Sequence, residues 1–270
     1  MSRVVQCQCC GGSVVYDVSL EASRCIFCGS TEMGLPPEQE TRVPVPDAAL
    51  RIQVDQTVAD DQYRAWARAS WWTPEELRSL QIDLRLMYIP AWWIRGEVES
   101  HWGGLVSAAT KSGKAPTSGI DTGVYEDMVP ASQGLTAAEL EELHPFVQEE
   151  QDAWDAEAAE IPFEVPAVSE EAARAWLHDR MTTVHLGDIQ RNHALLQTVG
   201  SSMVEEENHK LYMLPVYIGA FRFRERAWRF VINAQTGEVV GETPVDRQKV
   251  VMVVGGVLAG LWVLAKVASG

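Results

Sequence analysis

Alternating apolar and polar positions in the first half of the chain predict a strand, two helices and a second strand. Residues 50–54 are apolar at every second position, as in a strand with one buried face. An amphipathic helix carrying the triplet Arg-Ala-Trp at 64–66 is expected next, and Thr73 before Pro74 predicts a second helix with Thr73 as its N-cap. The aromatic segment 86–98 is expected to form a strand.

The second half of the chain repeats this order of elements. Residues 161–165 alternate again, and a helix is expected around a second Arg-Ala-Trp triplet at 174–176. Segment 211–218 carries the same aromatic, proline-containing pattern as segment 86–93. We interpret this as a degenerate duplication of an α+β unit, whose two halves pack as one pseudo-symmetric body.

A final hairpin is predicted after the second repeat of the pattern. Strand 221–224 alternates apolar and basic residues, strand 228–232 follows, and the turn 233–237 leads to a short return strand at 238–240. One face of this hairpin is therefore cationic. It is either a solvated surface or a surface that meets anionic headgroups or an acidic segment of the protein. The cations are Arg222, Arg224, Arg226 and Arg229.

The segment between the two halves is expected to be less regular. Residues 103–134 are rich in Gly, Ser, Thr and Ala, which predicts a long loop. Ala and Glu dominate residues 137–160, which predicts a helix with a partial apolar stripe. That helix either packs on the core or presents an acidic face to a basic partner.

The net charge of −16 comes almost entirely from one region. Residues 115–173 contain fifteen acidic residues and no Lys or Arg, whereas the rest of the chain carries 23 acidic and 22 basic residues. A uniformly acidic protein would repel nucleic acid at long range, but here only one region is acidic. The charge therefore indicates either a solvated surface or a docking site for a basic protein.

All five cysteines lie in the first 28 residues, and four of them have the spacing of a zinc ribbon. Cys7-x-x-Cys10 and Cys25-x-x-Cys28 are each followed by Gly, which permits the positive φ of a tight knuckle. Two such knuckles joined by a hairpin supply four thiolates for one structural Zn²⁺. Cys9 is expected to be a bystander, because Cys7-x-Cys9 is too short for a knuckle. The chain starts without the apolar core of a signal peptide, so disulfides are not expected.

The last residues of the chain predict a membrane anchor. Residues 250–265 are sixteen consecutive uncharged, mostly apolar residues. As a helix they would span about 24 Å, which is shorter than a bilayer core of about 30 Å, so a buried core helix is the alternative. The preceding basic flank, Arg247 and Lys249, favours a single-pass anchor in the inner membrane with residues 1–249 in the cytoplasm.

These patterns divide the chain into a zinc ribbon, a proline-rich linker, a duplicated α+β body with an acidic insert, and a transmembrane tail. The expected ranges are, in this order, residues 1–34, 35–47, 48–248 (first repeat 48–114, insert 115–160, second repeat 161–248) and 249–268.

No catalytic motif is found in the sequence. The chain lacks the phosphate loop, the dinucleotide-binding glycine motif, the H-E-x-x-H zinc motif and the G-x-S-x-G nucleophile motif. His185 and His193 lie near Asp188 but match no metal motif, so we expect them to be structural or surface residues. The tryptophan pairs at 71–72 and 92–93 are expected to build the core.

Several stretches share their residues with one known family. They are residues 7–12, 25–29, 88–92, 129–132, 143–146, 214–217 and, most specifically, 231–244. The chain resembles bacterial zinc-ribbon membrane proteins that are often labelled TFIIB-type zinc-ribbon or primosomal helicase-like proteins. Ala234 stands where the family has Gly, and the helicase label does not fit a chain without a nucleotide-binding motif. The resemblance implies a membrane-anchored adaptor, and some relatives are similar to partners of the PspA-type membrane-stress machinery and of flotillin-like SPFH proteins.

We therefore expect a non-enzymatic, membrane-anchored zinc-ribbon adaptor that docks protein partners at the cytoplasmic face of the membrane. Gly256 and Gly260 have the spacing that lets two apolar helices pack closely, which would allow a homo-oligomer. The alternative is a nucleic-acid-associated zinc-ribbon protein, which would need a basic groove built from Arg222, Arg224 and Arg229. A hydrolase with its site between the two halves is a third class, for which the sequence offers no residues.

Overall fold

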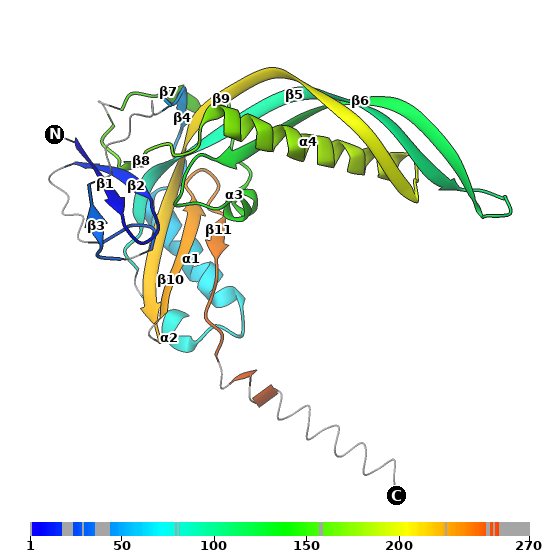
Figure 1. The fold of residues 1–270 in the computed structure, drawn as a ribbon. Coiled ribbons are helices and arrows are strands. Elements are labelled where there is room, and N and C mark those ends of the chain that lie inside the picture. The colour runs from blue at the N-terminus through cyan, green and yellow to red at the C-terminus, as the bar shows by residue number, and fades with distance from the viewer. Residues whose placement is uncertain are drawn as a thin grey trace, which may run out of the picture.

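The fold is α+β, as the sequence predicts, and the structure shows that its body is mostly sheet (Figure 1). A computed structural model describes residues 2–17, 24–28, 30–35, 44–78, 80, 82–156, 159–224, 226–246, 249–250 and 252–253. The helices are α1 (Gln56–Ala69), α2 (Glu75–Arg78), α3 (Ala137–Leu143) and α4 (Glu170–Asn192). The strands are β1 (Ser2–Cys7), β2 (Ser13–Asp17), β3 (Met33–Gly34), β4 (Ala48–Leu50), β5 (Arg85–Ser107), β6 (Lys114–Pro130), β7 (Gln151–Ala153), β8 (Phe163–Glu164), β9 (Gln197–Phe223), β10 (Arg226–Asn233) and β11 (Val239–Gly241).

Two long antiparallel strands, β5 and β9, form the spine of the molecule. Their register runs from Arg85 opposite Ile218 to Leu105 opposite Gln197, with one irregularity between Arg95 and Gly96. β6 pairs with residues 91–107 of β5, and β10 pairs with residues 216–223 at the end of β9. The residues of β5 from 89 to 94 are all buried, because apolar clusters cover both faces of the sheet there.

The two proline-containing motifs cross at the centre of this spine. Ile89 lies opposite Leu214, and each proline lies beside the other strand's motif, with Tyr88 opposite Pro215 and Pro90 opposite Met213. The short strand before each long helix also pairs with the long strand of the other half. β4, which precedes α1, runs parallel to β9, and β8, which precedes α4, runs parallel to β5. This arrangement is what two copies of one unit would give, while the duplication itself stays a prediction.

Each helix packs on the hairpin of the other half. α1 precedes β5, yet its Tyr63 stacks on Phe230 of β10 with ring centroids 4.7 Å apart. α4 precedes β9, yet its Leu177 and Met181 pack with Trp92 of β5. α4 starts where Ser169 accepts a hydrogen bond from the Ala172 N–H as N-cap. Every fourth residue of the helix from 173 to 189 is then buried.

The cysteine-containing module belongs to the same sheet as the body. The main path of the sheet runs β11-β10-β9-β5-β8-β2-β1-β3. β2 pairs with β8 through Val14 opposite Glu164 and Val15 opposite Phe163. The prediction of a separate ribbon at 1–34 held on a linker at 35–47 therefore needs correcting, because backbone hydrogen bonds fix the ribbon to the body. Residues 36–43 of that linker lie outside the described part of the chain.

The long loop expected at residues 103–134 is wrong, because β5 and β6 continue as a hairpin through most of this range. Exposed and half-buried positions alternate along β6 from 114 to 127, as in a strand with one face covered. Gly119 and Gly123 made this strand hard to recognise in the sequence, because glycine is more typical of loops than of strands. A Cβ at either position would approach the aromatic ring of Trp102 or Tyr125 to within 2.8 Å, so both glycines serve close packing rather than a turn.

Two predicted helices are also shorter than expected. Of residues 137–160 only α3 is helical; it starts at the capping box of Thr136 and Glu139 and ends before Pro145. α2 is a single turn, and Thr73 does not act as its N-cap, since the buried Thr73 hydroxyl has no hydrogen-bond partner. The strand expected at 50–54 is also misplaced, because β4 covers Ala48–Leu50 and residues 51–54 are not in a strand.

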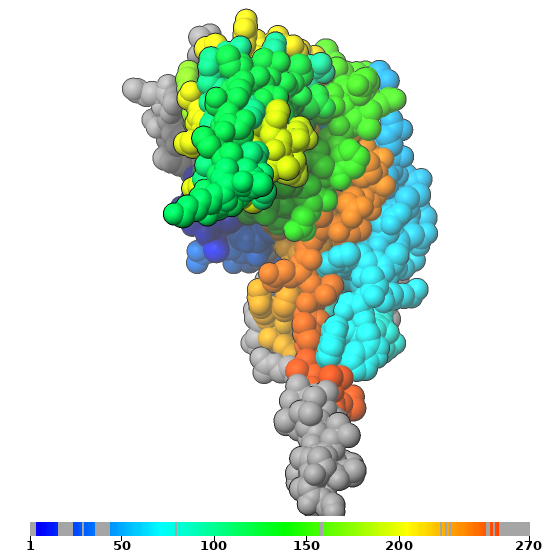
Figure 2. All heavy atoms as spheres, turned by 90° about the vertical axis from the view of Figure 1, so that its right-hand side faces the viewer, coloured from blue at the N-terminus to red at the C-terminus, as the bar shows by residue number. Residues whose placement is uncertain are grey.

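Beyond the body, three strands extend together as a curved arm with α4 beneath it (Figure 1). We call residues 95–127 and 197–208 the arm. Trp102, Ile189 and Leu195 form a small buried cluster between the arm and α4. The opposite face of the arm has no covering element among the described residues, and Figure 2 shows the arm as a projecting ridge seen end-on.

The predicted anchor at 249–268 lies outside the described residues, except for residues 249, 250, 252 and 253. Gly256 and Gly260 are therefore also outside them. Within the described part of the chain, no helix has both the length and the apolar character needed to span a bilayer.

Candidate metal centre and neighbouring polar sites

The four predicted cysteines come together at one point of the ribbon. Their Sγ atoms all lie within 4.8 Å of one another, and no other set of His, Cys, Asp or Glu among the described residues qualifies as a metal group. Cys7 Sγ is 3.6 Å from Cys28 Sγ, and Cys10 Sγ is 3.6 Å from Cys25 Sγ. Four thiolates around one zinc ion lie about 3.8 Å apart, given Zn–S bonds of about 2.3 Å. The cluster therefore fits a tetrahedral metal site.

Tight backbone turns hold the first knuckle in place. The Cys7 N–H donates to the Gly12 carbonyl at 3.0 Å, and the Gly11 N–H donates to the Cys7 carbonyl at 2.9 Å. Gly11 has φ of 78°, the conformation for which glycine was expected after the cysteine pair. In the second knuckle the Cys25 N–H donates to the Ser30 carbonyl at 2.7 Å.

The pKa values of Cys7, Cys10 and Cys25 are shifted differently because their surroundings differ. Burial raises the pKa of Cys7, but hydrogen bonds from the backbone N–H groups of Cys10 and Cys9 and from the Cys28 thiol outweigh it, and the pKa falls to about 7. Burial raises the pKa of Cys10 to about 11 and raises that of Cys25 further. A bound cation would deprotonate all four thiols, and N–H donors aimed at sulfur stabilise the resulting thiolates.

Cys9 lies beside the centre without joining it. Its side chain is exposed, and its backbone N–H lies 3.4 Å from the Cys7 Sγ. Nearby Cys28 raises the pKa of the Cys9 thiol. The placement agrees with the expectation of a bystander.

Phe27, inside the second knuckle, connects the centre to the body. Its side chain is 2% exposed and packs in one cluster with the cysteines and with Ile89 and Leu214 of the spine. A Cβ at Gly12 would lie 2.7 Å from the Phe27 ring, and one at Gly134 would overlap that ring. The ring is therefore clamped between the first knuckle and the loop that follows β6.

A buried carboxylate, Glu164, lies where the ribbon meets the body. Its side chain accepts hydrogen bonds from the Gln133 N–H at 3.0 Å, from the Gly134 N–H at 3.1 Å and from the Ser132 hydroxyl. Burial raises its pKa to about 7, although these donors oppose the rise. The sequence gives no signal for this residue, because a glutamate in an acidic region predicts exposure.

Glu164 makes stability depend on pH in a direction unusual for a carboxylate. Its pKa in the folded protein is about 7 against an ordinary 4.5, so its contribution is complete below about pH 4.5 and is lost as pH rises through 7. We expect Glu164→Gln to be more stable than the wild type at pH 8, by up to about 3 kcal/mol, and equal to it near pH 4.5. Urea unfolding of both proteins across this range measures the difference, and exposed Glu160→Gln should show none. An equal difference at both pH values would contradict the prediction.

A cleft opens beside the second knuckle. It has a volume of about 870 Å³ and lies between the ribbon and one face of β9 and β10. Its lining combines apolar Ile218, Phe221 and Trp228 with charged residues of both signs, including Arg24 and Glu32. Arg85 on its wall is paired with Asp83 at 3.3 Å, so part of the charge is already neutralised.

The predicted basic residues do not share one surface. Arg229 points inward, where it binds Glu139 and the Gly134 carbonyl, and this corrects the expectation that it is a solvated or partner-binding cation. Arg226 is exposed, pairs with Glu242 at 3.2 Å and lies 4.3 Å from the Trp228 ring centroid. Arg224 is exposed at the hairpin turn and lies over the Phe223 ring at 5.0 Å.

The remaining basic residues of the prediction are described only in part. The Arg222 side chain and Arg247 lie outside the described portion of the chain. Lys249 Nζ donates to the carbonyls of Trp71 at 2.8 Å and Thr73 at 3.1 Å, so it is bound to the body. A nucleic-acid groove built from Arg222, Arg224 and Arg229 consequently loses Arg229, which is held by Glu139.

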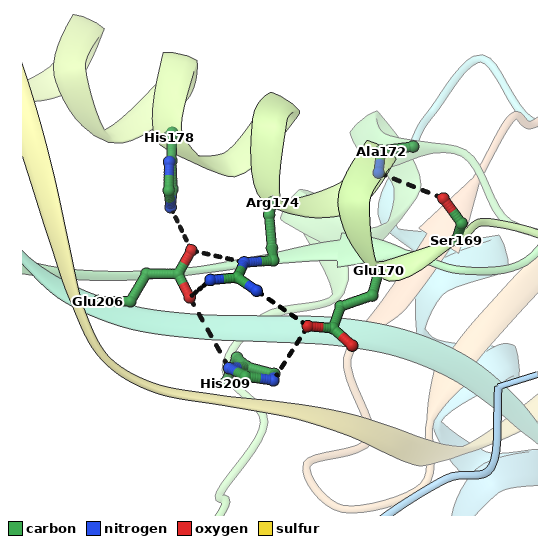
Figure 3. Close-up of polar contacts among 7 residues, drawn as sticks. All are labelled: Ser169, Glu170, Ala172, Arg174, His178, Glu206 and His209. Carbon is green, nitrogen blue, oxygen red and sulfur yellow. Dashed lines mark hydrogen bonds and ion pairs between the residues drawn. The ribbon is translucent and has the colours of Figure 1, made fainter.

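A charged network joins α4 to β9 next to the irregularity of the spine (Figure 3). Glu206 accepts from Arg174 at 2.7 Å and contacts His178 Nε2 at 2.5 Å. Arg174 also reaches Glu170 at 3.0 Å, and His209 bridges Glu170 and Glu206. Burial raises the pKa of Glu206, but Arg174 and His178 outweigh it and hold the pKa below its usual value.

A second polar group lies further along α4. The Tyr125 hydroxyl donates to Asp188 at 2.7 Å and is 2.9 Å from His185 Nδ1, while His193 Nε2 is 3.2 Å from the Asp121 carboxylate. The expectation that His185 is structural agrees with its burial. Sequence reasoning missed both networks. The available signal in the sequence was spacing: His185 lies four residues after Met181 and four before Ile189, in line with the apolar face of α4.

Comparison with known proteins adds no assignment to these sites. The chain has no significant match to a protein family model, a curated protein or a solved structure. The resemblance to zinc-ribbon membrane proteins therefore stays a prediction, and the function is argued from the geometry alone.

Proposed function

We propose that the protein is a membrane-anchored adaptor, in which a structural zinc ribbon stiffens a body that docks protein partners at the cytoplasmic face of the membrane. The four cysteines would hold the ion, whose role is to tie the two knuckles together in a module too small to have its own core. The zinc identity, the anchor and the PspA-like or SPFH-like nature of the partners are parts of this proposal.

The observation that carries the docking proposal is the uncovered face of the arm. Four large apolar side chains on it are at least half exposed: Ile120, Val124, Val199 and Met203. Alternation along β5, β6 and β9 places carboxylates on the same face. They are Glu97, Glu99, Glu126, Glu205 and Glu207, against two cations: Arg95, which pairs with Glu207 at 2.9 Å, and Lys114 at the tip of the arm. Apolar area surrounded by negative charge favours a basic, amphipathic partner.

The face also replaces the acidic helix as the candidate docking site. The expected acidic helix is reduced to α3, whose Leu140 and Leu143 are buried in the main core. The acidic region from 115 to 173 supplies β6, α3, β7, β8 and the start of α4. Deleting it would therefore unfold the body rather than remove a docking arm, so point changes on the arm are the appropriate test.

One experiment tests anchor and docking together. Full-length protein carrying a proximity-labelling enzyme is expressed in bacteria, and the membranes are washed with carbonate before labelled partners are identified. We expect the protein to resist the wash and to label a defined set of partners. Glu97→Lys with Glu205→Lys should keep the protein in the membrane but reduce that labelling about tenfold, because the charge of the docking face is reversed.

A matched control reverses the same amount of charge elsewhere. Glu142 of α3 and Asp179 of α4 are exposed, and their change to Lys should leave the partner set intact. Release of the wild type by carbonate would refute the anchor. Unchanged partners in the arm variant would refute the docking face and leave the anchor standing.

A further inference from the structure

Two tryptophans that were expected in the core lie at the surface, next to the place where the chain leaves the body. Trp71 is 54% exposed and Trp72 is 38% exposed, whereas Trp92 and Trp93 are buried as expected. The two exposed rings touch edge to face with centroids 5.0 Å apart, in the loop between α1 and α2. Exposed tryptophan pairs are costly in water and indicate a surface that another phase or molecule covers.

The residues that follow β11 are fixed to this tryptophan loop. The Asp246 N–H donates to the Trp72 carbonyl at 2.8 Å, and the Val250 N–H donates to the Asp246 carbonyl at 3.1 Å, which is one helical turn. Lys249 Nζ binds the Trp71 carbonyl and lies 5.5 Å from the Trp71 ring centroid. In Figure 2 the red-orange residues near 250 lie against the cyan segment that contains α2.

The apolar residues that follow Lys249 in the sequence indicate that a lipid bilayer covers the tryptophan loop. Met252 and Val253 are 64% and 40% exposed, and no charged residue occurs from 250 to 265. In the proposed anchor, the first residues of this apolar segment lie at the surface of the bilayer. Tryptophan is enriched at that depth because its ring is apolar while its N–H reaches water and headgroups, and lysine marks the same boundary.

We infer that Trp71 and Trp72, with Lys249, form a membrane-contact surface that rests in the headgroup region of the phospholipid bilayer. This inference depends on the proposed anchor and adds a second, non-covalent contact to it. The loop then holds the body at a fixed height and angle above the membrane, because Asp246 and Lys249 are hydrogen-bonded to the backbone carbonyls of Trp72 and Trp71.

The test uses full-length protein reconstituted in vesicles of phosphatidylcholine and phosphatidylglycerol, with and without brominated lipid, which quenches indoles that touch it. We expect the quenched signal to fall about threefold in Trp71→Phe with Trp72→Phe, because only Trp262 of the apolar segment remains in the bilayer. Each single change should remove part of the signal. Trp176→Phe is the matched control, since Trp176 is 38% exposed like Trp72 but lies on α4, and it should leave the quenching unchanged.

The outcomes separate this inference from the proposed function. Flotation of the wild type with the vesicles reports the anchor. If the protein floats and the double variant is quenched like the wild type, the contact surface is wrong and the anchor stands. If the wild type does not float, the anchor is wrong and the contact surface fails with it. Phe at both positions keeps an apolar ring at an exposed site, and thermal unfolding confirms that each variant is folded.

Discussion

Replacing Cys25 by Ser should abolish metal binding and destabilise the whole protein, not only the ribbon. Purified wild type is expected to carry about one zinc ion per chain, and Cys25→Ser should retain almost none, because three thiolates leave the tetrahedral site incomplete. Cys25 is 3% exposed and belongs to the main core cluster. A hydroxyl without its metal is then buried beside the spine, and we expect the melting temperature to fall by about 10 °C. Elemental analysis and thermal unfolding measure the two effects.

The neighbouring thiol provides the control for this experiment. Cys9 is exposed and lies outside the four-cysteine group, so Cys9→Ser should keep the full zinc content and the wild-type melting temperature. Full zinc content in Cys25→Ser would contradict the assignment of that ligand. Loss of zinc in Cys9→Ser would show that the ligand set is different from the one proposed.

Phe27→Ala should separate the ribbon from the body at a cost of about 3–5 kcal/mol. The Phe27 ring is clamped between Gly12 and Gly134, and neither glycine has a side chain that could fill the space left behind. β2 and β8 exchange hydrogen bonds over only two residue pairs, so the ring carries much of the cohesion between the two parts. Urea unfolding measures the loss, and limited proteolysis should release a fragment that contains the ribbon.

An exposed apolar residue directly after the ribbon tests the specificity of that effect. Leu35 is 77% exposed, and Leu35→Ala should change stability by less than about 0.5 kcal/mol. If Phe27→Ala is equally mild, the ribbon does not depend on this ring for its attachment. The zinc content of Phe27→Ala should stay near the wild-type value, because all four thiols are retained.

The metal centre and the repeated order of elements could be predicted because both rest on local spacing. Each of the two cysteine pairs has the spacing of a tight knuckle. The segments around Pro90 and Pro215 predict two similar strands, and these strands pair with each other in the structure. The hairpin from β9 to β11 was equally visible, since its alternation and the turn at Gly237 lie within about twenty residues.

The arm and the polar sites could not be predicted because their partners are distant in sequence. Gly119 and Gly123 are typical of a loop in the sequence, and only the structure shows that they pack against the rings of Trp102 and Tyr125. Arg229 and Glu139 are 90 residues apart, and Glu206 meets Arg174 across 32 residues. A charged residue in a strand gives no sequence signal for burial when its counter-charge comes from another element.

The exchange of helices between the two halves determines when the protein can fold during synthesis. α1 emerges from the ribosome early, but the ring that stacks on its Tyr63 belongs to Phe230, 167 positions later. Only Leu77, Leu84 and a few partly buried neighbours of its own half can cover α1 before β9 and β10 have been made, and closing so long a loop is slow. A nascent chain must keep the apolar face of α1 in solution through most of translation, and the last strands to be synthesised complete the core for both halves.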